Sequence, residues 1–297
     1  MTAKRFLTEV NPRGGTRRGL AILRNVQPVF AESGVQLDVR VTEHSGHARE
    51  IAETLDVENY DALCVIGGDG TIHEVADGLM RRGQQESIPL GIIPAGSGNT
   101  MHQHLGCIDP VEAARKIVAG RTCPLDVARV AFGEQVVYCV DIVGWGGVAD
   151  INCTAEKLRF MGPTRYAAAA LWHIVRANRR RATLVLDGQE VEDEFLFVIG
   201  CNTKFTGRGM KLAPRAEIDD GKIDVVVVRR ASRLQMLELF KRVFDGSHTS
   251  LSCVEYHQVR SFAIESAGRE VLDLDGEIKG TAPVRVQMLP GALRLFT

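Results

Sequence analysis

The sequence predicts an α/β domain followed by a mostly antiparallel β domain. Strand-like and helix-like segments alternate through roughly the first 125 residues, whereas after Pro124 most apolar runs have the length and spacing of strands separated by turns. The 297 residues, 45% of them hydrophobic, are enough to build two cores. We therefore expect residues 1–125 and residues 126–297 to form separate domains.

The α/β prediction for the first domain is based on its alternating periodicity. Helical spacing of apolar residues covers 19–31, 48–55 and 72–82, and short buried strands are predicted at 6–10, 35–41, 63–66 and 90–93. Such alternation predicts a parallel sheet with helices on both faces.

The second domain is predicted from short strands at 127–132, 135–143, 183–186, 195–200, 223–229, 261–265 and 284–289. Two helices interrupt it. The helix at 166–176 is apolar nearly all round, so it is either a buried structural helix or one that lines an acyl-chain site. The helix at 233–244 begins after the N-cap Ser232, and its apolar stripe, which includes Leu234 and Phe244, is expected to pack in the core.

Glycine-rich loops follow three predicted strands of the first domain. In Gly67-Gly68-Asp69-Gly70-Thr71, the glycines let a phosphate approach backbone N–H groups at the start of a helix. A carboxylate repels phosphate, so Asp69 indicates a role in the reaction, either holding magnesium or accepting a proton from an attacking hydroxyl. The alternative is that Asp69 only caps the helix.

The other two loops favour the functional interpretation. Pro94 to Thr100 is a second small-residue loop after a strand, and residues 11–19 form a third that carries Arg13, Arg17 and Arg18. Loops at the carboxyl ends of parallel strands face one crevice, where α/β sheets bind ligands. Arginines there could neutralise a polyphosphate, although a solvated basic turn is the alternative.

Composition excludes several classes of protein. A net charge of −1 and a pI near 6.7 provide no general attraction for nucleic acid. Seven scattered cysteines without a C-x-x-C pair predict free thiols in a reducing compartment. No apolar run approaches the ~20 residues that span a bilayer, and the N-terminus lacks the apolar segment of a signal peptide. We expect a soluble cytoplasmic protein.

Taken together, these loops resemble the nucleotide-site loops of the diacylglycerol kinase and sphingosine kinase superfamily of lipid kinases. Further motifs follow in family order: Thr42 to Ala48, Gly144 to Asp150, Glu156 to Tyr166, Gly209 to Ala216, Asp219 to Asp224, and Asp275-Gly276-Glu277. Two of them, Gly144 to Asp150 and Glu156 to Tyr166, look specifically like sphingosine (long-chain base) kinases. The resemblance extends from residue 8 to the C-terminus.

The resemblance implies two lobes, the first similar to phosphofructokinases and NAD kinases and the second a β-sandwich, with the active site in the cleft between them. In some members the last strand returns to the first lobe. It also implies ATP and Mg²⁺ as cofactors. The nucleotide-binding positions would be Asn11, Arg13, Thr42, Gly67, Gly68, Gly70, Thr71, Glu74, Gly96, Ser97, Gly98, Arg159, Arg165, Asp275 and Gly276.

The catalytic and metal-binding roles follow from the same resemblance. Asp69 would orient or deprotonate the lipid hydroxyl, and Glu277 is the competing base. Asp275 would face the nucleotide and its magnesium, and Asp220 would belong to a structural magnesium site. An Asp-Asp-Gly turn that needs no metal is the alternative for Asp220.

The substrate positions implied by the resemblance are Asp150, Asn152, Leu171 and Trp172. Sphingosine kinases have an acid at the position of Asn152 that meets the sphingoid amine, and an amide cannot supply that charge. The sequence therefore predicts an ATP-dependent kinase for the primary hydroxyl of a sphingoid base, with diacylglycerol or ceramide as the alternative. A soluble-substrate kinase similar to NAD kinases, or an inactive lipid- or nucleotide-binding protein, is less favoured.

The predicted partners are a long-chain lipid alcohol and, transiently, a membrane surface. Contact with membranes would be peripheral, through the rim of the lipid site and the basic residues 176–181. No nucleic-acid partner is expected, and the oligomeric state is left open, a homodimer included.

Overall fold

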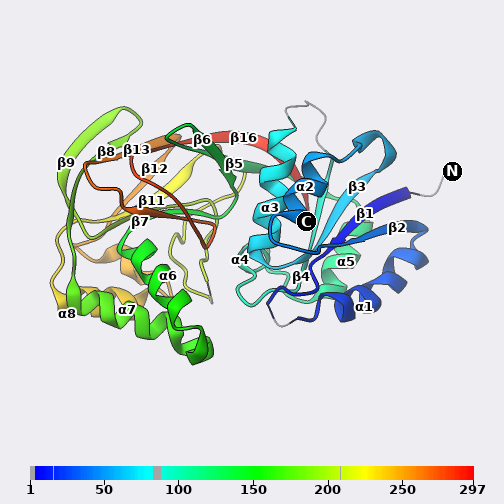
Figure 1. Cartoon of the computed structure of the whole chain (residues 1–297), viewed down its shortest axis with the longest axis horizontal. Helices are drawn as coiled ribbons and strands as arrows, with labels where there is room; N and C mark the ends of the chain where they lie inside the picture. Colours follow the sequence, from blue (N-terminus) through cyan, green and yellow to red (C-terminus); the bar gives the residue numbers. More distant parts are fainter. Residues whose placement is uncertain (1–3, 16, 83–87, 208) are drawn as a thin grey trace. The chain divides into compact units, whose positions relative to one another are not determined.

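The computed structural model describes residues 4–15, 17–82, 88–207 and 209–297 (Figure 1). The chain divides into two compact units. Unit 1 comprises Met1–Val127, Ile218–Asp220 and Leu289–Thr297, and unit 2 comprises Ala128–Glu217 and Gly221–Met288. The C-terminal segment thus belongs to unit 1, and two strands, β5 (Thr122–Phe132) and β16 (Val284–Phe296), contain the borders between units.

Unit 1 is built on a parallel sheet in which each strand lies beside the next in the order β2-β1-β3-β4, followed by the end of β16. The strands are β1 (Lys4–Val10), β2 (Val35–Val41), β3 (Ala62–Gly67) and β4 (Leu90–Pro94). The helices are α1 (Gly19–Glu32), α2 (His47–Glu53), α3 (Asp69–Arg81), α4 (Thr100–His104) and α5 (Pro110–Ala119).

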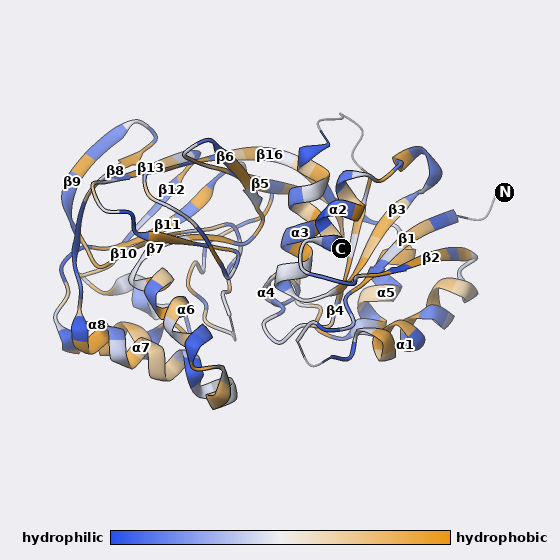
Figure 2. Cartoon of the chain, viewed as in Figure 1, coloured by the Kyte–Doolittle hydropathy of each residue, from blue (hydrophilic) through white to orange (hydrophobic). Residues whose placement is uncertain are grey.

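Helices cover both faces of this sheet, as its alternating periodicity predicts (Figures 1 and 2). Alternate residues of β1 point to opposite faces. Phe6 and Val10 pack with α1 and α5, whereas α2 and α3 pack against each other on the other side. The α2–α3 crossing is close because a Cβ on Gly78 would lie 2.4 Å from the Arg49 carbonyl oxygen.

Unit 2 contains two antiparallel layers that enclose one core. One layer is a six-stranded sheet in the order β12-β11-β10-β7-β14-β15, and the other is built from β16, β13, β8 and β9 with the β5–β6 hairpin. The bounds are β6 (Gln135–Cys139), β7 (Ile142–Gly146), β8 (Arg180–Leu186), β9 (Gln189–Phe195), β10 (Phe197–Cys201), β11 (Ile223–Val228), β12 (Glu255–Val259), β13 (Ser261–Ser266), β14 (Val271–Leu274) and β15 (Glu277–Thr281).

Helices α6 (Gly147–Lys157) and α8 (Arg233–Arg242) lie against the six-stranded sheet on its side away from this core. Helix α7 (Arg165–Arg176) packs on α6 and α8. Three 3₁₀ segments complete the described elements: Val57–Asn59, Arg159–Thr164 and Ser247–Ser250. Sequence periodicity predicts only two helices here and misses α6.

Helix α8 confirms one prediction and corrects another. Ser232 is the N-cap, and with Gln235 it forms a reciprocal capping box. However, the expectation that the whole apolar stripe packs in the core is wrong. Leu239 and Val243 are buried, whereas Leu234 and Phe244 are 78% and 51% exposed, because α8 covers the edge of the unit.

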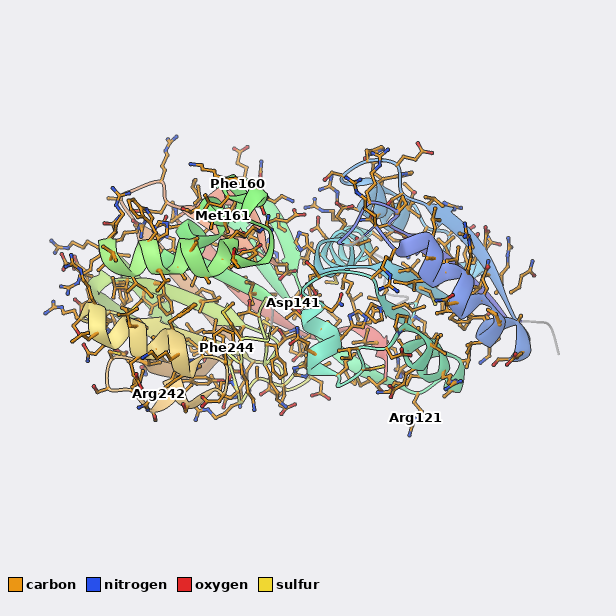
Figure 3. All side chains as sticks on the ribbon, turned by 90° about the horizontal axis from the view of Figure 1, so that it is seen from below. Arg121, Asp141, Phe160, Met161, Arg242 and Phe244 are labelled. Carbon is orange, nitrogen blue, oxygen red and sulfur yellow. The ribbon has the colours of Figure 1, made fainter. Side chains whose placement is uncertain are left out.

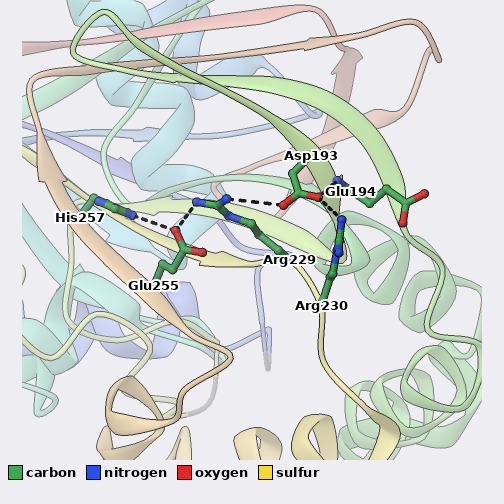
Figure 4. A network of polar contacts seen from close by, with 6 residues as sticks. All are labelled: Asp193, Glu194, Arg229, Arg230, Glu255 and His257. Atoms are coloured by element: carbon green, nitrogen blue, oxygen red, sulfur yellow. Dashed lines mark hydrogen bonds and ion pairs between the residues drawn. The ribbon is translucent and has the colours of Figure 1, made fainter.

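A network of ion pairs links the two layers of unit 2 at one end (Figure 4). Arg229, which follows β11, contacts Glu255 of β12 at 2.6 Å and Asp193 of β9 at 3.5 Å. Arg230 contacts the same Asp193 at 3.0 Å. The Glu194 N–H and these arginines lower the pKa of Asp193, so the carboxylate stays charged.

The cysteines and the helix lengths test two expectations drawn from composition. All seven cysteines are free, as predicted. None of the helices in the described ranges is long and apolar enough to cross a membrane.

Glu9 of β1 is fully buried, and among the described residues neither of its carboxyl oxygens has a hydrogen-bond partner. Burial raises its pKa to about 9; Arg40 on the neighbouring strand opposes the shift, and Glu74 adds to it. Below pH 4.5, Glu9 is protonated in both the folded and the unfolded chain. As the pH rises from about 4.5 to about 9, Glu9 loses its proton only in the unfolded chain. Ionisation therefore stabilises the unfolded state alone, and the free energy of unfolding falls over that window.

We expect Glu9→Gln to stabilise unit 1 at neutral pH because glutamine needs no proton to stay neutral. From the shift, the gain at pH 7 should be on the order of 3 kcal/mol at most and should vanish below pH 4.5. Thermal unfolding of wild type and variant between pH 4 and pH 9 measures it. Glu32→Gln, at an exposed glutamate, is the matched control. Parallel pH profiles for Glu9→Gln and wild type would contradict the prediction.

Candidate active site

The three glycine-containing loops of unit 1 touch one another through their backbones. A Cβ on Gly96 would lie 2.5 Å from the Gly68 Cα, and a Cβ on Gly15 would lie 2.8 Å from the Gly96 Cα. Gly15 also has a φ of +53°, which disfavours any residue with a side chain. The loops after β1, β3 and β4 therefore converge at the carboxyl end of the sheet, as the sequence predicts.

Asn11 organises the first of these loops and connects it to α3. Its Oδ1 accepts hydrogen bonds from the N–H groups of Arg13 and Gly14, at 2.9 and 2.8 Å. Its Nδ2 donates to Thr71 Oγ1 at 2.9 Å. The predicted nucleotide residues Asn11 and Thr71 are thus bonded to each other, and both shape the loop backbone that a phosphate would meet.

Asp69 is the first residue of α3, and its carboxylate reaches the neighbouring loop. Oδ1 accepts a 2.7 Å hydrogen bond from the N–H of Thr100, the first residue of α4. The N-cap of α3 is Gly68, and Asp69 binds the start of α4, so capping its own helix is not the only role of this carboxylate. This bond fixes the direction of the carboxylate beside the contact between Gly68 and Gly96.

The other predicted nucleotide residues of unit 1 surround these loops. Glu74 Oε1 accepts from the Gly46 N–H at 2.8 Å and so holds the loop after β2. Thr42 is buried beside Val10, and Arg13 donates to the Glu43 carbonyl at 3.1 Å. The remaining members lie in the converging loops themselves: Gly67, Gly70, Ser97 and Gly98.

In unit 2, the Asp275 carboxylate is bound by backbone. It accepts hydrogen bonds from the N–H groups of Val140, Asp141 and Ile142 at 2.8–2.9 Å. A carboxylate has about four lone-pair positions, so three are used by the turn before β7. Asp275 can therefore offer a magnesium ion at most one further lone pair.

Gly276 is held on both sides of its backbone. Asp273 accepts from its N–H at 3.0 Å, and Asn152 Nδ2 donates to its carbonyl at 2.7 Å. Burial raises the pKa of Asp273 to about 7, and Asn152 and the Gly276 N–H oppose this shift. Asn152, predicted to face the substrate, is 5% exposed and supports the turn that precedes Glu277.

Asp150, the other predicted head-group residue, is paired with a cation. Arg180 Nη2 lies 2.5 Å from its Oδ2, and His173 Nδ1 lies 3.9 Å away. The pKa of His173 is lowered, chiefly by burial, and its Nε2 is 2.8 Å from Thr154 Oγ1. The charge of Asp150 is therefore largely balanced by Arg180.

The structure places the remaining predicted residues as follows. Arg165 pairs with Glu156 at 3.2 Å, whereas the side chain of Arg159 lies outside the described part of the chain. Asp220 is exposed in the segment of unit 1 that follows Ile218, and Glu277 begins β15. Leu171 and Trp172 are 46% and 55% exposed on α7.

Two family matches cover most of the chain. Residues 5–130 match the Diacylglycerol kinase catalytic domain, and residues 141–297 match the YegS C-terminal NAD kinase beta sandwich-like domain. The chain belongs to the diacylglycerol kinase and sphingosine kinase superfamily of lipid kinases. The resemblance seen in the sequence and the predicted fold class are thereby confirmed, and the protein is a lipid kinase.

Individual relatives differ in the lipid that their names give. Sphingosine kinase 1 of Arabidopsis thaliana is 30% identical over 93% of this chain and 68% of its own length. Diacylglycerol kinase of Mycobacterium tuberculosis is 29% identical over 96% of this chain and 93% of its own length. The crystal structure of a diacylglycerol kinase from Bacillus anthracis, 21% identical, covers 99% of this chain and 96% of that one with a TM-score of 0.75, which shows the fold.

Four residues build the site through contacts that sequence reasoning did not predict: Asn99 and Thr100, which lie in the predicted second loop, Arg180 of the basic run 176–181, and Asp273. Asn99 has a φ of +52° and bonds Gly96 through both its side-chain oxygen and its amide, which shapes the third loop. The sequence signal for Asn99 was its place in the Gly-Ser-Gly-Asn-Thr run, where asparagine is typical of a turn. Nothing in the sequence links Asp273 to Asn152, or Arg180 to Asp150, because those pairs meet only in the fold.

We expect Gly96→Ala to separate the second and third loops, because its methyl group would overlap Gly68. The cost should be about 1–3 kcal/mol of stability. ATP affinity should also fall by roughly tenfold or more, since 1.4 kcal/mol corresponds to a factor of ten. Calorimetry of unfolding and of ATP binding measures both. Ser33→Ala, at the exposed C-terminal end of α1 and outside these loops, serves as the control. A Gly96→Ala variant with wild-type values would argue against the close contact.

We expect Asn152→Asp to destabilise unit 2 instead of simply restoring an amine site. The change removes the donor to the Gly276 carbonyl and adds a carboxylate beside Asp273, at a cost of about 1–3 kcal/mol. Thermal unfolding compares the variant with Gln189→Glu, the same amide-to-acid change at the exposed first residue of β9. Equal melting temperatures for the two variants would show that Asn152 does not support the turn.

Proposed function

We propose that this lipid kinase transfers the γ-phosphate of ATP to the primary hydroxyl of a sphingoid base. The observation that carries the proposal is the position of Asp69 in unit 1. Its carboxylate is oriented by the Thr100 N–H, directly beside the close contact of two glycine loops. Glycine backbone at a helix start suits the phosphates, and an oriented carboxylate suits the attacking hydroxyl.

The nucleotide phosphates would bind the converging loops of unit 1. Gly68 and Gly96 let the two loops pack together at the start of α3, where helix N–H groups could meet an anion, and Arg13 adds positive charge at the rim. The hydrogen bond from Asn11 to Thr71 fixes the first loop against the first turn of α3. Phosphoryl transfer depends mainly on such positioning and charge neutralisation, so a preformed loop contact supports this role.

Asp69 would accept the proton of the lipid hydroxyl, or orient that hydroxyl, as the oxygen attacks phosphorus. Glu277 is the competing base. It follows the turn that Asn152, Asp273 and Asp275 hold in place, so its backbone is also well supported. We favour Asp69 because its carboxylate direction is fixed by a hydrogen bond.

Magnesium fits the donor chemistry of these residues. Mg²⁺ prefers hard oxygen ligands and keeps several waters, so it needs only one or two carboxylates. Asp275 is a hard oxygen donor of this kind, and its three backbone hydrogen bonds fix the direction of its carboxylate. When bound with ATP, magnesium neutralises charge on the transferred phosphate. The proposed structural ion at Asp220 stays a prediction.

Two classes of lipid substrate differ in their head group, and different observations favour each. Similarity to a plant sphingosine kinase favours a sphingoid base, whose ammonium Asp150 could receive. The pairing of Asp150 with Arg180, and an amide at position 152, instead favour a neutral lipid such as diacylglycerol or ceramide. Leu171 and Trp172 are proposed to contact the acyl chain.

Two other classes are less well supported. A kinase of a soluble substrate would not need the exposed apolar residues on α7. An inactive binding protein is less favoured because the chain carries acids at the three positions that the resemblance marks for catalysis and magnesium, Asp69, Asp275 and Glu277, although two of them also hold backbone. A homodimer remains a prediction.

The deciding experiment measures phosphate transfer from ATP and Mg²⁺ to sphingosine, diacylglycerol, ceramide and NAD. We expect sphingosine phosphate from the wild type and a loss of about 10²–10⁴-fold for Asp69→Asn. Asparagine can still accept from the Thr100 N–H, so the variant should fold. Asp56→Asn, at an exposed acid in the same unit, should keep full activity.

Each outcome decides between stated alternatives. Product from diacylglycerol or ceramide but not sphingosine would keep the kinase and overturn the sphingoid-base proposal. A larger loss for Glu277→Gln than for Asp69→Asn would reassign the base. Phosphorylation of NAD alone would exclude a lipid substrate in this panel.

A further inference from the structure

The loop after β2 is held by a side chain of the helix that follows it. His47 is the first residue of α2, and its Nδ1 lies 3.0 Å from the backbone nitrogen of Glu43. A backbone N–H can only donate a hydrogen bond, so this ring nitrogen accepts and carries no proton. His47 is therefore a neutral imidazole in this structure, with its hydrogen on Nε2.

The same loop holds two predicted nucleotide residues. The Glu43 carbonyl oxygen accepts a 3.1 Å hydrogen bond from Arg13 Nη1, and the Gly46 N–H donates to Glu74 Oε1 at 2.8 Å. The bond to His47 fixes the peptide before Glu43, and the bond from Arg13 uses the peptide after it. A change of backbone direction at Glu43 therefore moves the acceptor that holds Arg13.

A second histidine makes a charge on His47 unfavourable. The ring of His44 is stacked on that of His47, with centroids 4.8 Å apart and planes 12° from parallel. His44 Nδ1 lies 3.1 Å from the Ser45 carbonyl oxygen, and its Nε2 lies 3.9 Å from Glu50 Oε2. Both nitrogens of His44 thus face oxygens, which suits a protonated ring. Two protonated rings at this spacing would repel, so the stack favours a charged His44 beside a neutral His47.

We propose that His47 is a positioning residue that holds Arg13 for the nucleotide phosphates only while its imidazole is neutral, which makes ATP binding proton-dependent. With a proton on Nδ1, the ring becomes a donor that faces the Glu43 N–H, which is also a donor. The Glu43 backbone then turns away, and Arg13 loses its carbonyl acceptor. The proposal rests on the proposed function, because Arg13 acts as a phosphate ligand only if the chain binds ATP.

Other charged side chains pack around this segment from three elements. They are Arg13 in the loop after β1, Glu43, Arg49 and Glu50 beside His47, and Glu74 and Asp77 on α3. The two acids of α3 have partners of their own. Glu74 accepts from the Gly46 N–H, and Asp77 lies 2.9 Å from Arg81 Nε. The Glu43 N–H is in direct contact with Nδ1 of His47, so a proton added there acts first on that bond.

The test measures the Kd of the full chain for ATP with Mg²⁺ by calorimetry, without lipid, at pH 8 and pH 5.5. Histidine is the side chain that ordinarily changes charge within this range. Between these values we expect the wild type to lose about tenfold more affinity than His47→Asn. Asparagine places Oδ1 where histidine has Nδ1, so it accepts the Glu43 N–H at both pH values. ATP itself changes charge over this range, and the comparison of the two proteins removes that effect.

A second variant imitates the loss of the acceptor. His47→Phe keeps an aromatic ring but cannot accept the Glu43 N–H, so it should bind ATP about tenfold more weakly than wild type already at pH 8. Its pH dependence should equal that of His47→Asn. Thermal unfolding checks that both variants are folded. The same pH dependence in wild type and His47→Asn would overturn the proposal, and so would wild-type affinity of a folded His47→Phe at pH 8.

Matched controls separate this effect from general changes of charge. Arg13→Gln should lose most of the additional pH dependence, because Arg13 is the group that His47 positions. Arg121→Gln changes an exposed arginine that projects from the surface of unit 1 (Figure 3). His257→Asn changes a histidine of unit 2 that lies 3.5 Å from Glu255 (Figure 4). Both controls should follow wild type. Wild-type pH dependence in Arg13→Gln, or its loss in either control, would contradict the proposal.

Hydrogen exchange of residues 42–50 without nucleotide separates failure of this proposal from failure of the proposed function. After correction for the intrinsic exchange rate, these amides should exchange faster at pH 5.5 than at pH 8 in the wild type but not in His47→Asn. This difference without ATP binding at either pH would place the failure in the proposed function. Equal exchange in the two proteins, with ATP bound normally, would overturn the role of His47.

Discussion

The close contact of Gly68 with Gly96 is the constraint on which the candidate site depends. Any side chain at either position would push the second and third loops apart, because each Cβ would overlap the other residue's Cα. The contact brings α3 and α4 to one place, and only then can Asp69 at the start of α3 accept from the Thr100 N–H. Backbone proximity therefore positions both the phosphate-binding groups and the carboxylate that would act on the hydroxyl.

Two buried carboxylates of unit 2, those of Asp273 and Asp275, hold backbone. Asp275 binds the turn before β7 through three N–H groups, and Asp273 and Asn152 hold Gly276 from both sides. Residues that a motif marks as ligand-binding thus have structural partners of their own. Such a side chain can still contact a ligand. Its substitution, however, first destabilises the turn that it supports, because the buried partner loses its hydrogen bond.

Periodicity predicted most elements because their burial is regular. Strand β2 has the predicted bounds, and α1 begins as predicted and ends one residue later. Helix α3 begins three residues and ends one residue earlier than predicted. Helix α6 was missed because Gly147 and several small polar residues give it a weak apolar period. The apolar stripe of α8 was read as core, yet Leu234 is exposed, since periodicity reports an apolar face and not what covers it.

The sequence by itself determined the alternating α/β region, the β-rich region, the glycine loops and the superfamily, since all of these are local patterns or ordered motifs. Only the tertiary structure decided that Asp69 binds α4, that Arg180 balances Asp150, that Asn152 supports Gly276, and that α7 turns apolar residues outward. These depend on pairs of residues distant in the chain, and neither partner carries a local signal that names the other.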